Sequence, residues 1–412
     1  MSDLNETPRG MRTVIAFLGR RNAGKSSLLN ALVGYDLAIV SDVAGTTTDP
    51  VHKAVEINPL GPCVVIDTAG IDDVGALGQM RIEKTREVIK DSDLGLIIIG
   101  DGSWTDFEEE IYQMLKEKDK PVIAVINKVD IDAGKDLEIL LTNKNIEYVR
   151  TSVPEGLGIK ELKEKIRAQK KAERFEDLSI IGDIINAGDL VLLVVPLDLG
   201  APKGRLILPQ VQTIRDILDN DATAVVVKER ELADTLDKLY VKPGLVITDS
   251  QVVLKAAGDV PPEIPLTTFS TIFTRFKGDL RQMVEGVGAI DQLQNGDKVL
   301  IAEACTHHAL ADDIGRVKIP RWITQYSGKD LSFDVAAGPN FPPNIKDYSL
   351  IVQCGGCTIT RRAYCNRIET AAEQGVPITN YGIAISYVQG VLPRIISPFP
   401  ELRDLAEELK AW

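Results

Sequence analysis

The sequence lacks long apolar runs and an excess of basic residues. Its longest apolar stretches, 94–99 and 190–195, are far too short to cross a membrane and are typical of buried parallel strands. The N-terminus has neither the basic nor the apolar segment of a secretory leader, so we expect a cytoplasmic protein with no membrane partner. A net charge of −13 argues against nucleic acid as the main partner, because phosphate contacts come from clustered Lys and Arg.

Cysteine and histidine are also scarce, and they are unevenly placed. The 412 residues contain five cysteines and three histidines, and most of both lie in the last third of the chain. The length suggests two or three domains, and 44% hydrophobic with 26% charged residues is ordinary for a globular protein. The chain can therefore build its cores without disulfides, and the clustered thiols call for a chemical explanation.

A phosphate-binding loop follows the first apolar run, 14–18. Residues 19–26 have the sequence Gly-Arg-Arg-Asn-Ala-Gly-Lys-Ser, which fits the pattern G-x-x-x-x-G-K-[ST] between a strand and a helix. Backbone N–H groups there surround the phosphates, Lys25 reaches the β- and γ-phosphate oxygens, and the Ser26 hydroxyl binds Mg²⁺. The sequence thus predicts a nucleoside triphosphate site. The nucleotide contacts expected in this loop are Gly19, Asn22, Ala23, Gly24, Lys25, Ser26 and Ser27.

Three later segments predict that the base is guanine. An apolar run ends in Asp67-Thr68-Ala69-Gly70, where the carboxylate can hold Mg²⁺ and the Gly70 N–H can meet the γ-phosphate. Another run ends in Asn127-Lys128-Val129-Asp130, whose aspartate can accept hydrogen bonds from both N1–H and the exocyclic amine of guanine. Adenine has no such pair of donors. Ser152 and Val153, after a short strand, are expected to contact the base edge.

These segments resemble the nucleotide-binding elements of the Ras-like GTPase family over about residues 10–170. The resemblance implies that Thr48, in the segment 45–49, binds Mg²⁺ and that the catalytic residues are Lys25, Thr48, Asp67 and Gly70. The loop 19–26 and the segment 44–50 are similar to the branch that includes Era and the tRNA-modification protein MnmE. That branch implies a K⁺ ligand at Asn22. Ile71 stands where signalling GTPases have a glutamine, which implies slow intrinsic hydrolysis.

The middle of the chain carries no evident chemistry. A charged helical run, 160–176, ends the GTPase part, and the segment after it has neither cysteine nor histidine. The pattern there predicts strands and helices in alternation at 190–195, 210–218, 223–227, 230–239 and 244–248. A homodimer interface explains such a module better than a rigid spacer does. The prolines at 261–265 predict a hinge at its end.

The last segment combines thiols with imidazole. Cys305-Thr306-His307 and Cys354-Gly355-Gly356-Cys357 predict a metal site rather than a disulfide, because thiols stay reduced in the cytoplasm. The two glycines free the backbone to turn both sulfurs towards one centre. Zinc would take four closed ligands, Cys305, His307, Cys354 and Cys357. A [4Fe–4S] cluster would take the three thiolates, with His307, a carboxylate or an exchangeable ligand on the fourth iron. The residues alone leave both metals open.

The combination of these three parts resembles HydF, the family of [FeFe]-hydrogenase maturation GTPases, over essentially the whole chain. The resemblance implies an α/β protein of three modules with mainly parallel sheets. The expected modules are a GTPase domain at 1–176, a dimerization domain at 177–262 and an iron–sulfur domain at 263–412. It also implies GTP or GDP with Mg²⁺, a [4Fe–4S] cluster, and a homodimeric scaffold that carries a diiron subcluster precursor. The implied partners are the radical-SAM maturases HydE and HydG and the apo-hydrogenase.

Two other functions stay open at this point. One is a ribosome- or tRNA-associated GTPase with a structural zinc site, which the acidic balance and the cysteine pattern disfavour. The other is a redox catalyst, which would need a substrate pocket that the sequence does not indicate. Cys63 and Cys365 are expected to be small buried apolar residues, because free cysteines usually are.

Overall fold

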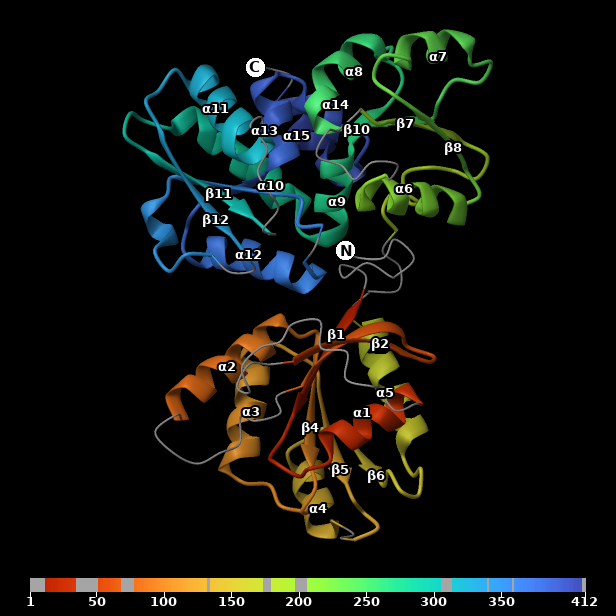
Figure 1. Ribbon diagram of the computed structural model, residues 1–412, viewed down its shortest axis with the longest axis vertical. Helices are drawn as coiled ribbons and strands as arrows, with labels where there is room; N and C mark the ends of the chain where they lie inside the picture. Colours follow the sequence, from red (N-terminus) through yellow and green to blue (C-terminus); the bar gives the residue numbers. More distant parts are fainter. Residues whose placement is uncertain are drawn as a thin grey trace. The chain divides into compact units, whose positions relative to one another are not determined.

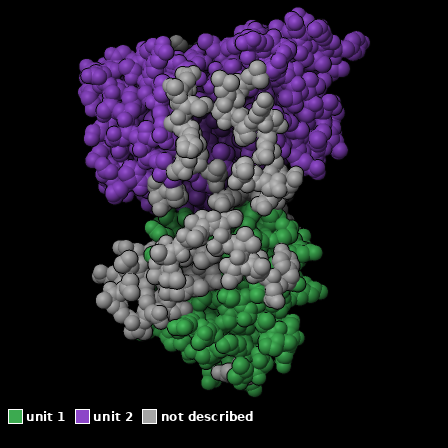
Figure 2. Space-filling view, in the orientation of Figure 1, with its two compact units in different colours: residues 1–177 green, residues 178–412 purple. Residues whose placement is uncertain are grey.

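Three sheets form the framework of the protein in a computed structural model. It describes residues 12–34, 51–67, 78–131, 134–172, 179–196, 206–304, 313–338, 341–357 and 359–409. The chain divides into two units, Met1–Asp177 and Leu178–Trp412, which Figure 2 colours separately. The first unit holds a six-stranded sheet and the second holds two four-stranded sheets. Within the described ranges, no helix has both the length and the apolarity that a membrane span needs.

Apolar runs of the first unit form a sheet with the order β2-β3-β1-β4-β5-β6. Strand β2 is antiparallel to β3, and the other neighbours are parallel. The strands are β1 (Thr13–Leu18), β2 (Val51–Ile57), β3 (Gly61–Asp67), β4 (Leu94–Ile99), β5 (Val122–Asn127) and β6 (Tyr148–Thr151). Every residue of β4 is buried, as expected for a parallel strand covered on both faces.

Helices cover both faces of this sheet (Figure 1). On one face, leucines and isoleucines of α1 (Lys25–Val33) and α5 (Ile159–Ala172) join the core. On the other face lie α2 (Gly78–Asp91), α3 (Asp106–Glu117) and α4 (Lys135–Asn143). This arrangement brings the carboxyl ends of the parallel strands to one edge, where α/β proteins bind their ligands.

The first sheet of the second unit is wholly parallel and has the order β10-β9-β7-β8. Its strands are β7 (Leu190–Val194), β8 (Thr223–Val227), β9 (Leu245–Thr248) and β10 (Leu266–Thr268). The helices that alternate with them are α6 (Leu208–Asp219), α7 (Leu232–Lys238) and α8 (Val253–Asp259). Strand β10 lies beyond the predicted limit at residue 262, so this sheet extends past that limit.

The second sheet of this unit is also wholly parallel, with the order β12-β11-β13-β14. Its strands are β11 (Lys298–Glu303), β12 (Ser332–Ala337), β13 (Leu350–Gln353) and β14 (Ile378–Asn380). Helices α11 (Ile319–Ser327) and α12 (Arg361–Glu373) connect successive strands. The predicted class, α/β with mainly parallel sheets, is confirmed.

One apolar core, from Ile180 to Ala406, joins the two sheets of the second unit. The helices drawn between the sheets in Figure 1 are α9 (Phe269–Lys277), α10 (Leu280–Val287), α13 (Tyr381–Val388), α14 (Leu392–Ile396) and α15 (Arg403–Glu408). The sequence predicts a hinge at 261–265. In the structure, Arg394 of α14 donates hydrogen bonds to the Val260 and Pro261 carbonyl oxygens, both at 2.8 Å. This segment is therefore anchored to α14.

Candidate nucleotide and metal sites

The predicted phosphate-binding loop connects β1 to α1 through two glycines in left-handed backbone conformations. Gly19 has a φ of 150° and Gly24 a φ of 93°. A Cβ on Gly19 would lie 2.3 Å from the Ile98 carbonyl oxygen, and one on Gly24 would lie 2.3 Å from Asn127 Nδ2. Both neighbours leave no room for a side chain, which explains why the loop needs glycine at these two positions.

Lys25 is buried inside this loop, with 7% of its surface exposed. Its Nζ donates hydrogen bonds to the carbonyl oxygens of Gly19 at 2.6 Å and Arg20 at 2.9 Å. Ser26 and Ser27 follow it in the first turn of α1 and are exposed. Because the N–H groups of a helix N-terminus attract anions, the ammonium and the two hydroxyls stand where phosphate oxygens can reach them.

The predicted guanine-binding segment contacts the phosphate-binding loop directly. Asn127, at the end of β5, donates from Nδ2 to the Ala23 carbonyl oxygen at 2.9 Å and accepts from Thr151 Oγ1 at 3.0 Å. Lys128 Nζ donates to the Asn22 carbonyl oxygen at 2.6 Å. The ends of β5 and β6 are thus joined to the loop after β1, which brings the predicted base and phosphate contacts to one edge of the sheet.

The remaining predicted base contacts differ from one another in their exposure to solvent. Asp130 is exposed and Val153 half-buried. Ser152 is fully buried, and within the described part of the chain its Oγ has no hydrogen-bond partner. An unpaired buried hydroxyl costs about 1–3 kcal/mol, which a bound ligand could offset.

Three predicted catalytic or magnesium-binding residues are not fully described. Asp67 ends β3, with its backbone in register with Phe17 of β1. Its side chain lies outside the described part, as do Thr48, Gly70 and Ile71. The structure therefore brings together the contacts from β1, β5 and β6, while the predicted roles of Thr48, Asp67 and Gly70 stay predictions.

An ion pair between distant residues also holds the loop. Arg20 Nε donates to Glu108 Oε1 at 2.7 Å, and the carboxylate is fully buried. The second oxygen of Glu108 accepts from the N–H of Thr105 at 2.9 Å and from its Oγ1 at 2.6 Å, which caps α3. The pattern Thr105-x-x-Glu108 is a helix-capping signature and could have identified this carboxylate.

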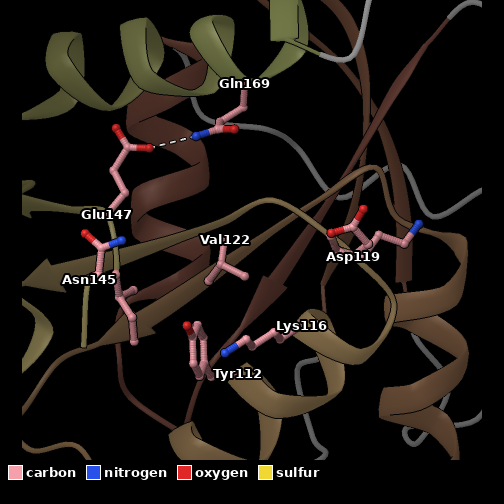
Figure 3. Close-up of a pocket in the computed structure, with 9 residues that line it drawn as sticks. Tyr112, Lys116, Asp119, Val122, Asn145, Glu147 and Gln169 are labelled. Carbon is pink, nitrogen blue, oxygen red and sulfur yellow. Dashed lines mark hydrogen bonds between the residues drawn. The ribbon is translucent and has the colours of Figure 1, made fainter.

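A separate pocket of this unit (Figure 3) lies at the amino ends of β5 and β6, whereas the predicted nucleotide contacts lie at the carboxyl ends of the strands. It holds about 280 Å³ beside Val122, where β5 begins, and beside Glu147, which precedes β6. Gln169 of α5 closes part of it and donates from Nε2 to Glu147 Oε2 at 2.7 Å. Among the described residues that line this pocket, none is a predicted nucleotide contact.

The Cys-x-x-Cys segment follows β13 and lies beside the end of β11. The Cys354 N–H donates to the Ala302 carbonyl oxygen at 2.9 Å, and the Ala304 N–H donates to Cys354 Sγ at 3.1 Å. Burial raises the pKa of the Cys354 thiol, whereas Cys357 is exposed. Gly356, between them, has a φ of 59° that favours glycine.

The other predicted metal ligands are Cys305, which directly follows Ala304 in the sequence, and His307, and both lie outside the described residues. Within the described part, no three histidine, cysteine or carboxylate side chains gather as a metal site would require. The structure thus brings Cys354 and Cys357 onto one short loop, and the ligand set as a whole stays a prediction. Cys63 is buried, as expected, and Cys365 is half-buried and donates from Sγ to the Lys277 carbonyl oxygen at 3.1 Å.

Two buried cations lie near this loop, and no pattern in the sequence indicates either of them. Lys277 and Arg367 are each 3% exposed. Lys277 Nζ donates to the Gly356 carbonyl oxygen at 2.7 Å, and Arg367 donates to the Glu303 carbonyl oxygen at 3.1 Å. Burial lowers the pKa of Lys277 to about 8, while the thiols of Cys357 and Cys354 act to raise it. Two buried basic side chains therefore lie beside the cysteine loop.

Comparisons with known families cover both units. The hydrogen maturase F dimerization domain matches residues 180–278, and the hydrogen maturase F tetramerization domain matches residues 281–398. A 50S ribosome-binding GTPase domain matches residues 14–128. The chain belongs to the hydrogen maturase F family. Its first unit is a GTPase domain, for which GTP or GDP and Mg²⁺ are the expected ligands, and its second unit consists of the family's two self-association domains.

The curated relatives of this hydrogen maturase F chain include tRNA modification GTPases. The tRNA modification GTPase MnmE of Aquifex aeolicus is 38% identical over 169 residues, which are 40% of this chain and 36% of that protein. MnmE of Lachnoclostridium phytofermentans is 41% identical over 162 residues, 38% of this chain and 34% of that protein. The chain thus spans about a third of the length of these relatives. Among solved structures, Aquifex aeolicus Era is 24% identical, with 52% of this chain and 92% of that chain covered and a TM-score of 0.31.

Proposed function

We propose that this member of the hydrogen maturase F family hydrolyses GTP and acts as a scaffold that binds a [4Fe–4S] cluster. Its cargo would be the diiron subcluster precursor, which it would deliver to apo [FeFe]-hydrogenase. Family membership supports this function. The structural observation that carries it is the contact between the Ala304 N–H and Cys354 Sγ, because Cys305 is the next residue after Ala304.

The GTPase unit would hold the triphosphate between its first and fifth strands. Lys25 now donates to two loop carbonyls, and phosphate oxygens would replace those acceptors. Ser26, Thr48 and Asp67 would hold Mg²⁺, which neutralises the charge that develops during phosphoryl transfer. We expect slow intrinsic hydrolysis, because Ile71 cannot orient water as a glutamine does, and stimulation by K⁺ bound at Asn22.

Nucleotide exchange would then regulate the scaffold. In GTPases of this class the γ-phosphate and Mg²⁺ order the switch segments, which are released on hydrolysis. The corresponding residues here are 46–48 and 70–80. We infer that this switch governs docking of HydE, HydG and the apo-hydrogenase rather than chemistry at the cluster.

Three thiolates would hold the cluster, those of Cys305, Cys354 and Cys357, and the fourth iron would take His307, a carboxylate or an exchangeable ligand. The donor chemistry fits, because cysteine thiolates are the ordinary ligands of [4Fe–4S] clusters. The nearby cations Lys277 and Arg367 suit a negatively charged centre. Bound there, the cluster would offer one exchangeable coordination position for the cargo.

A homodimer is the proposed assembly of the scaffold. The two self-association matches support association in general. Strand β8 is the edge of its sheet, and its residue Val226 is 43% exposed. An edge strand presents unpaired N–H and C=O groups to a second copy, so we infer that β8 contributes to the interface.

A second candidate is a ribosome- or tRNA-associated GTPase with structural zinc, in keeping with the descriptions of the GTPase model and of the MnmE relatives. The GTPase model matches residues 14–128, whereas residues 180–278 and 281–398 match hydrogen maturase F domains. The net charge of −13 also disfavours RNA as a partner.

Anaerobic purification decides between the two candidates. We expect iron in the protein and an electron paramagnetic resonance signal after reduction, because a [4Fe–4S]⁺ centre is paramagnetic and Zn²⁺ is silent. Stoichiometric zinc without iron, in protein from cells supplied with both metals, would contradict the scaffold function and support the second candidate.

A further inference from the structure

Lys277 is the last residue of α9, and its ammonium is buried where no carboxylate pairs with it among the described residues. Removing an ion from water costs several kcal/mol, so buried lysines normally have a carboxylate partner. The charges of the Cys357 and Cys354 thiols act to raise the pKa of this ammonium instead, and the Cys365 thiol donates to the Lys277 carbonyl oxygen at 3.1 Å. The hydrogen bond of the ammonium, 2.7 Å long, goes to the carbonyl oxygen of Gly356 between Cys354 and Cys357.

We propose that Lys277 is the counter-cation of the metal centre. Its ammonium offsets the negative charge of the metal-bound Cys354 and Cys357 thiolates and holds the loop between them through the Gly356 carbonyl. This inference rests on the proposed function, because it requires a metal cluster at these cysteines.

Several contacts fix α9 against the cysteine loop. Tyr364 of α12 is fully buried, and its Cδ2 lies 2.7 Å from where a Cβ on Gly356 would be. Its hydroxyl lies 3.4 Å from Thr274 Oγ1, almost one turn before Lys277 on α9. The carboxyl end of a helix favours a cation, so burying a positive side chain at this position costs less free energy.

The hydrogen bond from Lys277 to Gly356 connects two different domains of the family. Lys277 lies in the part that matches the dimerization domain, and Gly356 lies in the part that matches the tetramerization domain. The cysteine loop is therefore held by a residue of the preceding domain. A metal centre at these cysteines would place its charge beside α9, whose Arg275 donates from Nη1 to Asp183 Oδ1 at 2.8 Å.

The proposed charge compensation predicts the direction in which the midpoint potential of the cluster changes when the charge is removed. Reduction adds one negative charge to a cluster, and a fixed positive charge nearby stabilises the reduced state. Removing that charge must make reduction harder, so the midpoint potential must become more negative. A residue that merely fills space would leave the potential unchanged.

The test uses the full-length protein reconstituted anaerobically with iron and sulfide. Lys277→Met and Lys277→Gln both remove the charge, and the glutamine keeps a donor for the Gly356 carbonyl. Lys277→Arg keeps the charge. Lys298→Met is the matched control, because Lys298 is exposed at the opposite end of β11 in the same sheet. Iron content, circular dichroism and the midpoint potential from a redox titration followed by electron paramagnetic resonance are measured for each.

We expect both uncharged variants to reduce with an equilibrium constant about tenfold lower than wild type, a shift of about 59 mV for one electron. Lys277→Arg and Lys298→Met should keep the wild-type potential. Folded Met and Gln variants that lose iron, while the Arg variant retains it, also support the inference. A wild-type potential in the uncharged variants, or equal loss of iron in the Arg variant, overturns this inference alone. A wild-type chain that binds no iron overturns the proposed function and this inference with it.

Discussion

Lys128 donates a hydrogen bond from Nζ to the carbonyl oxygen of Asn22 over 2.6 Å, and Asn22 has a left-handed φ of 62°. The bond joins the guanine-binding segment to the phosphate-binding loop and fixes the backbone of Asn22. The side chain of Asn22 is exposed. Its amide oxygen is therefore available for a cation beside the phosphates.

The first prediction concerns that cation. We expect GTP hydrolysis to be about tenfold faster in K⁺ than in Na⁺, which corresponds to ~1.4 kcal/mol of transition-state stabilisation. Asn22→Ala should abolish the difference. Asn22→Gly is the matched variant, because glycine adopts the left-handed φ without strain and also lacks the amide. Steady-state rates in the two salts are the measurement. Equal wild-type rates would refute the K⁺ site.

The second prediction separates the two sites. Lys25→Ala should reduce GTP hydrolysis by at least about 100-fold, because the ammonium that stabilises the phosphate charge is gone. Iron content after reconstitution should stay at the wild-type value, because the cysteines lie in the other unit. Lys160→Ala, whose side chain is 93% exposed, serves as the control. A large loss of iron in Lys25→Ala would show that the two sites depend on each other.

The third prediction concerns the base. Asp130→Asn should weaken GTP binding by about 100-fold or more, because two hydrogen bonds to a charged acceptor contribute about 1.5–3 kcal/mol each. Xanthosine triphosphate should bind the variant better than GTP does, since its 2-oxo group accepts from the new amide. Titration with fluorescent nucleotides measures both affinities. Unchanged affinity for GTP would remove Asp130 from the base contacts.

Local patterns in the sequence predicted much of this fold. Strands β7, β8 and β9 lie within one residue of the predicted 190–195, 223–227 and 244–248, because apolar runs between turn residues determine strands locally. The loop from Gly19 to Ser26 was predictable for the same reason. Its geometry depends on glycines and a helix start that are adjacent in the chain.

Contacts between distant residues were not predictable in this way. Arg20 and Glu108 are 88 positions apart, and Lys277 and Gly356 are 79 positions apart. In a single sequence, a charged residue that is buried in the fold cannot be distinguished from one that is exposed to solvent. The anchoring of residues 257–261 by Arg394 is a similar case, because prolines predict a hinge unless a distant helix returns to bind their carbonyl groups.

The fourth prediction tests the proposed dimer interface. Val226→Lys places a charge on edge strand β8 and should shift the protein towards the monomer, because a lysine on an edge strand opposes pairing with a second strand. Light scattering after size-exclusion chromatography gives the mass. Leu254→Lys on α8 is the control, since Leu254 is 57% exposed and lies off the sheet edge. An unchanged mass of Val226→Lys would exclude β8 from the interface.

The last prediction concerns the fourth iron of the proposed cluster. Serine in place of Cys305, Cys354 or Cys357 should abolish cluster binding, because a hard alkoxide replaces a soft thiolate poorly. Cys365→Ser should leave iron content unchanged, because Cys365 is not a predicted ligand and its Sγ donates to the Lys277 carbonyl.

His307→Ala should behave differently from the three ligand variants. It should retain the cluster but change its paramagnetic resonance spectrum and its response to added imidazole or cyanide, because one exchangeable position is altered. A scaffold needs such a position to accept its cargo, whereas a structural site has all positions closed. Complete loss of iron from His307→Ala would show a closed site, and delivery through an open position would then be excluded.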